Sequence, residues 1–396
     1  METVSILRDL AIIILFAKAF GLLARKLKAP MVVGEILAGV ALGPLLGLVQ
    51  ESEFITYMAE IGVILIMFSA GLETNLKELK KSGLVAFLVA CAGVAIPMIG
   101  GTLLYLGMYG FDGFGTEKFF KALFIGSIMT ATSVGITVET LKELGYLKGK
   151  VGQVILSAAI IDDVIGIIVL TFVLGFKDPS QKPVSVVLST VLFFVIAVVG
   201  GYLFYKLFKW IDARYTHTRR IPIIGFALCF ITAYLAEKYF GIADITGAYV
   251  AGIILCNTQD ADYIDRKVTV SNYMIFGPIF FFSIGLKTNI SAMDKDLLIF
   301  SILFVVIAMG TKIIGCGAVA KCFKYKNMDA LKVGVGMMTR GEVALIITKK
   351  GEKLGIIDSS YLIPVILLII ISSVTVPILL KILYTKVPDP ETGAEA

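Results

Sequence analysis

The chain alternates between long apolar runs and short polar connectors. A transmembrane helix needs about 20 mainly apolar residues, and thirteen runs come close to that length. The runs cover residues 6–24, 31–49, 54–72, 83–109, 119–140, 151–175, 184–207, 221–239, 243–257, 269–287, 297–320, 329–349 and 359–381. The pattern predicts an all-α polytopic membrane protein with thirteen transmembrane helices. Because no small-residue cleavage pattern follows the first run, we expect it to be a helix of the protein rather than a removable signal peptide.

Composition supports this prediction. Of the 396 residues, 58% are hydrophobic and 17% are charged, and the mean hydropathy is +0.91. Water-soluble domains of this length do not have such a composition. The five cysteines have neither CxxC nor Cys/His spacing, so they predict neither a disulfide framework nor a metal site. The single histidine, His217, lies in a basic connector, which excludes zincin and serine-triad chemistry. We expect no enzyme activity and no cofactor.

Basic residues are unevenly divided between alternate connectors. Three lysines lie within 77–81, for example, whereas the connector before it carries the acids Glu51 and Glu53. By the positive-inside rule, the N-terminus is predicted to lie outside a plasma membrane and the C-terminus in the cytoplasm. The three lysines within 349–353 run against this topology, which places them outside. The net charge of +6 is explained by the cytoplasmic connectors, so no nucleic-acid partner is expected. The expected partner is the lipid bilayer.

The sequence also repeats itself. The segment 68–76 matches 282–290 at six of nine positions, and 34–39 resembles 247–252 in the same register. Runs one to six therefore correspond to runs eight to thirteen, and run seven links them. The extra crossing makes the second copy start from the opposite face, so the repeats are inverted, as in many secondary transporters.

This repeat divides the chain into four parts. They are a first six-helix repeat (1–175), a linker helix with a cytoplasmic loop (176–220), a second six-helix repeat (221–385) and a cytoplasmic tail (386–396). Transporters built in this way bind their substrates near the bilayer midplane, between the repeats.

The fifth and twelfth runs, which correspond to each other, both contain clusters of Thr, Ser and Gly. They lie around residues 130–137 and 333–341, where they lower helix propensity and offer oxygen atoms. Close helix packing through small residues is the alternative interpretation. Two broken helices that cross bring like dipole ends together, which requires nearby compensating charges. Arg340, Glu342 and Lys287 are the candidates.

Two neighbouring acids, Asp162 and Asp163, lie in the middle of the sixth run. A charged side chain at that depth costs on the order of 2.5 to 3.5 kcal/mol, and such acids usually face a water-filled cavity and bind ions or protons. A buried structural pair is the alternative, but it needs a cation for each carboxylate, and the apolar runs offer few. The pair is our main candidate for ion and proton binding.

These features together resemble the cation:proton antiporters of the NapA and NhaA type. They comprise the Asp162-Asp163 pair, Thr132-Ser133, the segment ending in Lys287, and Thr339-Arg340-Gly341-Glu342. The resemblance covers nearly the whole chain and is closest to the thirteen-helix branch (cation:proton antiporter-2) that includes the Kef potassium-efflux proteins. It implies a homodimer in which each subunit has a dimerisation domain and a moving core.

The resemblance also implies roles for individual residues. Asp163 is the ion- and proton-binding carboxylate, Asp162 pairs with Lys287, and Thr132 and Ser133 line the site, so that Na⁺ binds at Asp163, Asp162 and Thr132. An Asp-Asp pair with a lysine resembles the electrogenic members. Kef-type proteins usually carry a further nucleotide-binding domain, and the end of this chain soon after run thirteen favours a plain antiporter.

Competition at one carboxylate explains how exchange could work. A proton or a small hard cation can neutralise it, and exchange results when only the neutralised forms cross the apolar barrier. The sequence therefore predicts Na⁺/H⁺ exchange, with another monovalent cation such as K⁺ (a Kef-type exchanger), an organic-anion symporter and a cation channel as alternatives. An intramembrane aspartyl protease is disfavoured, because its two acids lie on different helices. Lys287 is predicted either to carry a proton or only to hold two domains together.

Overall fold

The computed structural model describes residues 3–27, 29–74, 76–175, 183–214, 218, 220–287 and 295–388. Within these ranges the backbone forms sixteen α-helices, two π-helical segments and one 3-10 turn, without strands. The first half contains α1 (Thr3–Lys26), α2 (Met31–Val40), η1 (Ala41–Leu45), α3 (Glu53–Leu72), α4 (Leu76–Tyr109), α5 (Glu117–Ile128), α6 (Val134–Glu143), α7 (Lys150–Gly175) and α8 (Pro183–Arg214). The second half contains α9 (Arg220–Phe240), α10 (Asp244–Leu255), α11 (Ala261–Ser271), η2 (Asn272–Phe276), α12 (Gly277–Leu286), α13 (Lys295–Cys322), α14 (Asn327–Gly336), α15 (Glu342–Lys353), η3 (Ser359–Tyr361) and α16 (Leu362–Lys386).

Long apolar helices dominate the described part of the chain. Eight of them are long and apolar enough to cross a membrane, and two shorter apolar helices, within 31–45 and 244–255, accompany them. Their exposed residues are largely hydrophobic, and α8 is the extreme case, with only 11% of its most apolar stretch buried. Such a surface is stable against lipid rather than water, so the protein is an all-α polytopic membrane protein.

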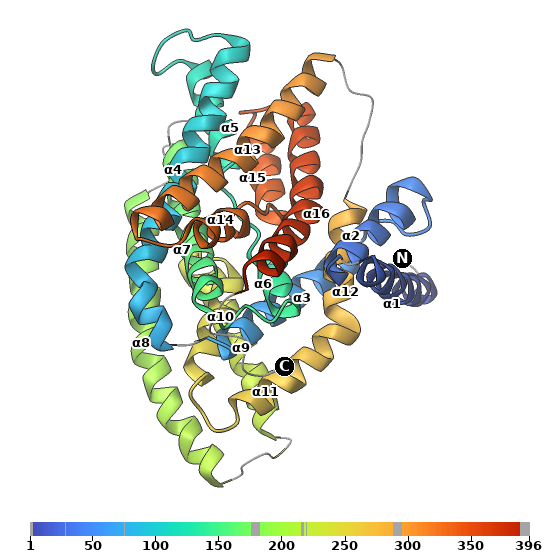
Figure 1. Cartoon of the computed structure of the whole chain (residues 1–396), viewed down its shortest axis with the longest axis vertical. Helices are drawn as coiled ribbons and strands as arrows, with labels where there is room; N and C mark the ends of the chain where they lie inside the picture. Colours follow the sequence, from blue (N-terminus) through green and yellow to red (C-terminus); the bar gives the residue numbers. More distant parts are fainter. Residues whose placement is uncertain are drawn as a thin grey trace.

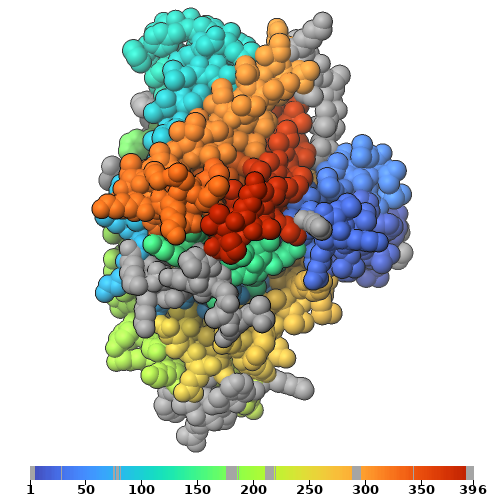
Figure 2. Space-filling model, viewed as in Figure 1, coloured from blue at the N-terminus to red at the C-terminus, as the bar shows by residue number. Residues whose placement is uncertain are grey.

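The helices pack in two groups, and each group draws on both halves of the sequence. Helices α4 to α7 pack with α13 to α16, whereas α1 to α3 pack with α9 to α12. We call these the core group and the scaffold group (Figure 1). In the space-filling view, α13 to α16 form a continuous surface, and α1 and α2 lie to one side of it (Figure 2).

Two predicted runs are interrupted in the middle. Residues 129–133 separate α5 from α6, and residues 337–341 separate α14 from α15. The two interruptions contact each other, because the Ser133 amide donates to the Thr339 carbonyl oxygen at 2.8 Å and the Thr137 hydroxyl donates to that of Gly336 at 2.9 Å. The backbones also approach closely: a Cβ on Gly341 would lie 2.6 Å from Ser133 Oγ. The core group is therefore built around a crossing of two broken helices.

The repeated segments make reciprocal contacts in the scaffold group. Gly39 of α2 packs so closely on α12 that an added Cβ would lie 2.0 Å from the Phe282 carbonyl oxygen. Gly252 of α10 packs on α3 in the same way, 2.4 Å from the carbonyl oxygen of Phe68. Since Gly39 matches Gly252 and Phe68 matches Phe282 in the repeat, each half presents the same surface to the other.

Candidate functional site

The two neighbouring acids lie at the centre of the core group. Asp162 and Asp163 are in the middle of α7, a continuous helix of 26 residues, and they are 2% and 8% exposed. Because no apolar environment tolerates two adjacent carboxylates without compensation, their surroundings define the site.

Both carboxylate oxygens of Asp162 are bound by protein groups. Lys312 of α13 lies with its Nζ 2.7 Å from Asp162 Oδ1, and the ammonium is fully buried. Thr132 of the first interruption donates its hydroxyl to Asp162 Oδ2, also at 2.7 Å. Asp162 is thus the anchor of a three-element network that joins α7, α13 and the crossing.

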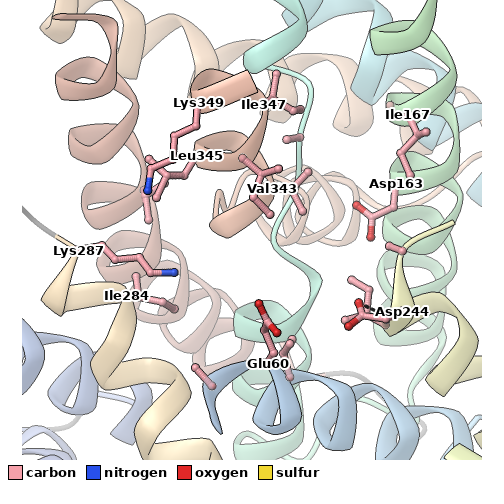
Figure 3. A pocket seen from close by; sticks show the side chains of 18 of the residues that line it. Glu60, Asp163, Ile167, Asp244, Ile284, Lys287, Val343, Leu345, Ile347 and Lys349 are labelled. Carbon is pink, nitrogen blue, oxygen red and sulfur yellow. Dashed lines mark hydrogen bonds between the residues drawn. The ribbon is translucent and has the colours of Figure 1, made fainter. Parts of the chain in front are cut away.

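The expected pairing of Asp162 with Lys287 is wrong, since Lys312 takes that position. Lys287 is the C-cap of α12, in the scaffold group, and its side chain lies across a cavity from Asp163 (Figure 3). The sequence did carry a signal for Lys312: a lysine in the middle of the apolar run 297–320 needs a buried anion. Lys287, at the end of its run, does not.

A cavity of about 560 Å³ opens beside the acids, between the core and scaffold groups. Asp163 faces it, as do Glu60 of α3, Asp244 of α10 and Lys287, together with apolar side chains of α15 such as Val343 (Figure 3). Asp162, which is bound by Lys312, also lines this cavity, so an ion in the cavity can reach both acids of the pair.

The two predicted hydroxyl ligands occupy different positions. Thr132 binds Asp162, as described, and Ser133 Oγ is buried without a hydrogen-bond partner in the described part of the chain. The residues of the first interruption that line the cavity are Thr130 and Ala131. Sequence reasoning missed Thr130 as a lining residue, because the side that each residue of an unwound segment faces does not follow a helical period.

Arg340 lies at the crossing and is fully buried. Its Nη2 donates to the Met129 carbonyl oxygen at 2.8 Å and to that of Ala308 at 3.2 Å, and Nη1 donates to that of Met337 at 3.4 Å. Met129 and Met337 are the C-caps of α5 and α14, whose negative dipole ends meet here. The guanidinium therefore neutralises both ends. The side chain of Glu342, the other predicted compensator, lies outside the described residues.

A second set of charges ties the two groups together at the C-terminal end of α6, away from the crossing. Lys142 Nζ lies 2.9 Å from Glu73 of α3 and 3.6 Å from Asp265 of α11. The Met31 amide at the start of α2 donates a bifurcated hydrogen bond to the two carboxylate oxygens of Glu143, at 2.8 and 3.0 Å. We call these contacts the α6 clamp. A cavity of about 160 Å³, smaller than the one beside the acids, lies next to it.

Crossed broken helices, buried acids and a one-sided cavity define a membrane transporter for small ions. The family model described as "Sodium/hydrogen exchanger, transmembrane" matches residues 11–385, and the chain belongs to this family.

Curated relatives are similar over most of their length. The probable Na⁺/H⁺ antiporter GerT of Bacillus cereus is 36% identical to this chain, and the similar region covers 87% of this chain and 90% of GerT. The Na⁺/H⁺-K⁺ antiporter GerN of the same organism is 34% identical, with 92% of each chain covered. The fold is similar to that of the sodium proton antiporter MjNhaP1 from Methanocaldococcus jannaschii, with a TM-score of 0.74 over 100% of this chain and 99% of that one, at 17% identity.

Proposed function

We propose that the protein exchanges Na⁺ for protons across the membrane by alternating access, with Asp163 binding the two ions in turn. The observation that carries this proposal is the position of the acid pair at the cavity. Both Asp162 and Asp163 line the cavity, and Asp162 is also bound by Lys312 and Thr132. A carboxylate that faces the cavity can be neutralised there by a proton or by a hard cation.

The arrangement of the two groups supports alternating access. The cavity reaches Asp163 from one side, and the α6 clamp closes the gap between the groups at the other. Sliding of the core group against the scaffold would exchange the open and closed sides. Moving a charged Asp163 through the apolar barrier is costly, so the core group moves only when a proton or a cation neutralises this carboxylate. The flows of the two ions are therefore coupled.

The proton-carrier role, one of the two roles predicted for Lys287, fits Lys312 better. Cation binding at Asp163 adds a positive charge close to Lys312 and draws Asp162 toward the cation, and both effects favour release of the lysine proton. This step would move one more charge per cycle and make exchange electrogenic. Lys287, which faces the cavity from the scaffold group, is proposed to repel cations from its own side of the entrance and so to guide them toward Asp163.

The finer architecture is also part of the proposal. The reciprocal contacts of Gly39 and Gly252 support two inverted six-helix repeats. Thirteen crossings result when α5 with α6, α14 with α15, and the continuous segment of α11, η2 and α12 each count as one crossing. With the N-terminus outside, the large cavity opens outward, because the connectors that border it around Glu51 and Gly241 then lie outside. A homodimer and a place in the NapA/NhaA-type branch complete this proposal.

Potassium is a second candidate cation. GerN, one of the relatives, is named a Na⁺/H⁺-K⁺ antiporter. The cavity beside Asp163 supplies oxygen ligands, which bind either ion. Cation preference is measured by comparing Na⁺, Li⁺ and K⁺ in the assay below.

The test is ion-driven proton movement in proteoliposomes. The wild type is expected to exchange, and Asp163→Asn is expected to abolish exchange while the protein remains folded, because the amide cannot alternate between charged and neutral forms. Asp262→Asn, at an exposed position on α11, is the control and should behave as the wild type. Exchange by Asp163→Asn at the rate of the wild type would contradict the proposal.

A further inference from the structure

A glycine on α4 faces the buried ion pair. A Cβ on Gly93 would lie 3.1 Å from Asp162 Oδ1, 3.1 Å from Lys312 Nζ and 3.0 Å from Cys316 Sγ. All three distances are shorter than the 3.4–4 Å of ordinary van der Waals contact. Both charged atoms of the pair therefore lie against Gly93, where α4 has no side chain.

We propose that Gly93 is a positioning residue: by lacking a Cβ, it allows Lys312 to reach Asp162 and sets the geometry of their ion pair. This inference rests on the proposed function, because the pair matters for transport only if its charges take part in exchange. Gly93 has no ionisable group, but under this inference it affects the pH dependence of exchange.

The surroundings leave little room for a methyl group to be accommodated elsewhere. Helices α4 and α13 also approach closely at Gly100, where a Cβ would lie 2.8 Å from Thr311 Cγ2, and at Gly315, where it would lie 3.1 Å from the Ala92 carbonyl oxygen. Local separation of the two helices at Gly93 would break these close contacts. Protein interiors relax only partly around an added methyl, so the atoms nearest to it must move.

Cys316 is the third neighbour of Gly93, and it also has little room to move. It is one helical turn from Lys312 on α13, fully buried, and its thiol lies 3.6 Å from the Val89 carbonyl oxygen of α4. Its sulfur therefore cannot swing away from Gly93 without losing this contact. The displacement caused by a methyl at Gly93 falls on the Asp162–Lys312 pair.

Other groups share the electrostatics of the pair and must stay unchanged in the test. They are Asp163 beside it on α7, Arg340 at the crossing, Cys91 on α4 and Cys316 on α13. A change in the pH profile is assigned to the pair only between two proteins in which these residues are the same. The neighbouring glycine Gly100 provides the matched control, because a methyl there also presses on α13 but contacts Thr311 and Ile307, not the charged atoms.

The experiment compares wild type, Gly93→Ala, Gly100→Ala and Lys312→Gln in proteoliposomes. The readouts are the pH at half-maximal Na⁺-driven proton movement, the melting temperature, and the pH dependence of the Na⁺-induced rise in melting temperature. We expect Gly93→Ala to move the pH midpoints by about half a unit or more, in the same direction as Lys312→Gln. Gly100→Ala is expected to lower the melting temperature without moving them.

The outcomes separate the two proposals. If the wild type does not exchange Na⁺ for protons, the proposed function fails. If the wild type exchanges but Gly93→Ala and Gly100→Ala share its pH midpoints, Gly93 serves only helix packing and the inference is overturned. The same holds if Lys312→Gln leaves the midpoints unchanged. Should Gly93→Ala not fold, Gly93→Ala/Cys316→Ala takes its place, and Cys316→Ala alone becomes its reference, so that residue 316 is the same in both proteins. Midpoints of the double variant that lie between those of this reference and Lys312→Gln support the inference. Midpoints equal to those of the reference overturn it.

Discussion

At the scale of single residues, the buried charges bind one another and the backbone before they can bind any ion. Asp162 forms an ion pair with Lys312, and Arg340 donates hydrogen bonds to carbonyl oxygens of three elements. Removing one partner of a buried ion pair leaves the other charge uncompensated, which typically costs about 3 to 5 kcal/mol. Each of these residues therefore has a measurable contribution to stability, separate from any contribution to transport.

Lys312→Gln should lower the melting temperature and make the remaining exchange electroneutral, because Asp162 loses its cation and no second proton is released. Membrane-potential dependence of exchange is the measurement. The control is Lys287→Gln, which alters no ion pair of Asp162 and should leave the potential dependence as in the wild type. If the Lys287 variant became electroneutral and the Lys312 variant did not, the proton-carrier role would return to Lys287.

Arg340→Lys should lower the melting temperature substantially, although the charge is kept. A guanidinium has five donors in a rigid fork and reaches Met129, Ala308 and Met337 together, whereas an ammonium on a flexible stem cannot. Arg266→Lys, at an exposed position on α11, is the control and should melt as the wild type. Equal melting temperatures for all three proteins would show that the helix ends need no such compensation.

The candidate residues could be predicted to different degrees. Asp162 and Asp163 stand out because an acid in an apolar run is costly wherever it lies. The partner of Asp162 could not be chosen by family resemblance alone, since several lysines lie in late runs, Lys287 and Lys312 among them. Only the packing of α7 and α13 against α4 brings Lys312 close to Asp162. Gly93 could not be predicted from the sequence, because its proposed role depends on which atoms of other helices lie where a Cβ would be.

At the scale of elements, the repeat and the helix breakers were informative. Clusters of Thr, Ser and Gly located both interruptions, because these residues weaken a helix where no packing supports it. Their ends could not be located from the sequence: residues 129–133 and 337–341 are fixed by hydrogen bonds between the two segments, such as that from Ser133 to Thr339. Contacts between residues far apart in the sequence are invisible to a local pattern.

Gly341→Ala should disrupt the crossing. Its Cβ would lie 2.6 Å from Ser133 Oγ and 2.8 Å from Ser133 Cβ, so the two unwound segments must separate. We expect a lower melting temperature and a loss of Na⁺-driven exchange of about tenfold or more, because small displacements of a binding constellation are costly. Gly310→Ala, on α13 with open space around the added atom, is the control. A Gly341 variant that matches this control would argue against a tight crossing.

At the scale of the whole molecule, the two groups of helices touch through apolar surface around the cavity and through charges at the α6 clamp. Lys142 and Glu143 belong to the core group, whereas Glu73, Asp265 and Met31 belong to the scaffold. Contacts of this kind can break and re-form during sliding, since partly exposed ion pairs are individually weak.

Lys142→Ala should loosen the clamp. Amide hydrogen exchange near Glu73 and Asp265 is expected to accelerate, because opening of that side no longer breaks two ion pairs. Lys148→Ala, at an exposed position just beyond α6, serves as the control. Unchanged exchange rates in the Lys142 variant would mean that apolar packing alone keeps this side closed.

The reciprocal contacts of Gly39 and Gly252 have an energetic consequence. In the proposed alternating-access cycle, matching surfaces on the two halves of the scaffold would give the core group similar contacts in the outward-open and inward-open states. The two states would then have similar free energies. The ion gradients, rather than the protein, would set the direction of net exchange.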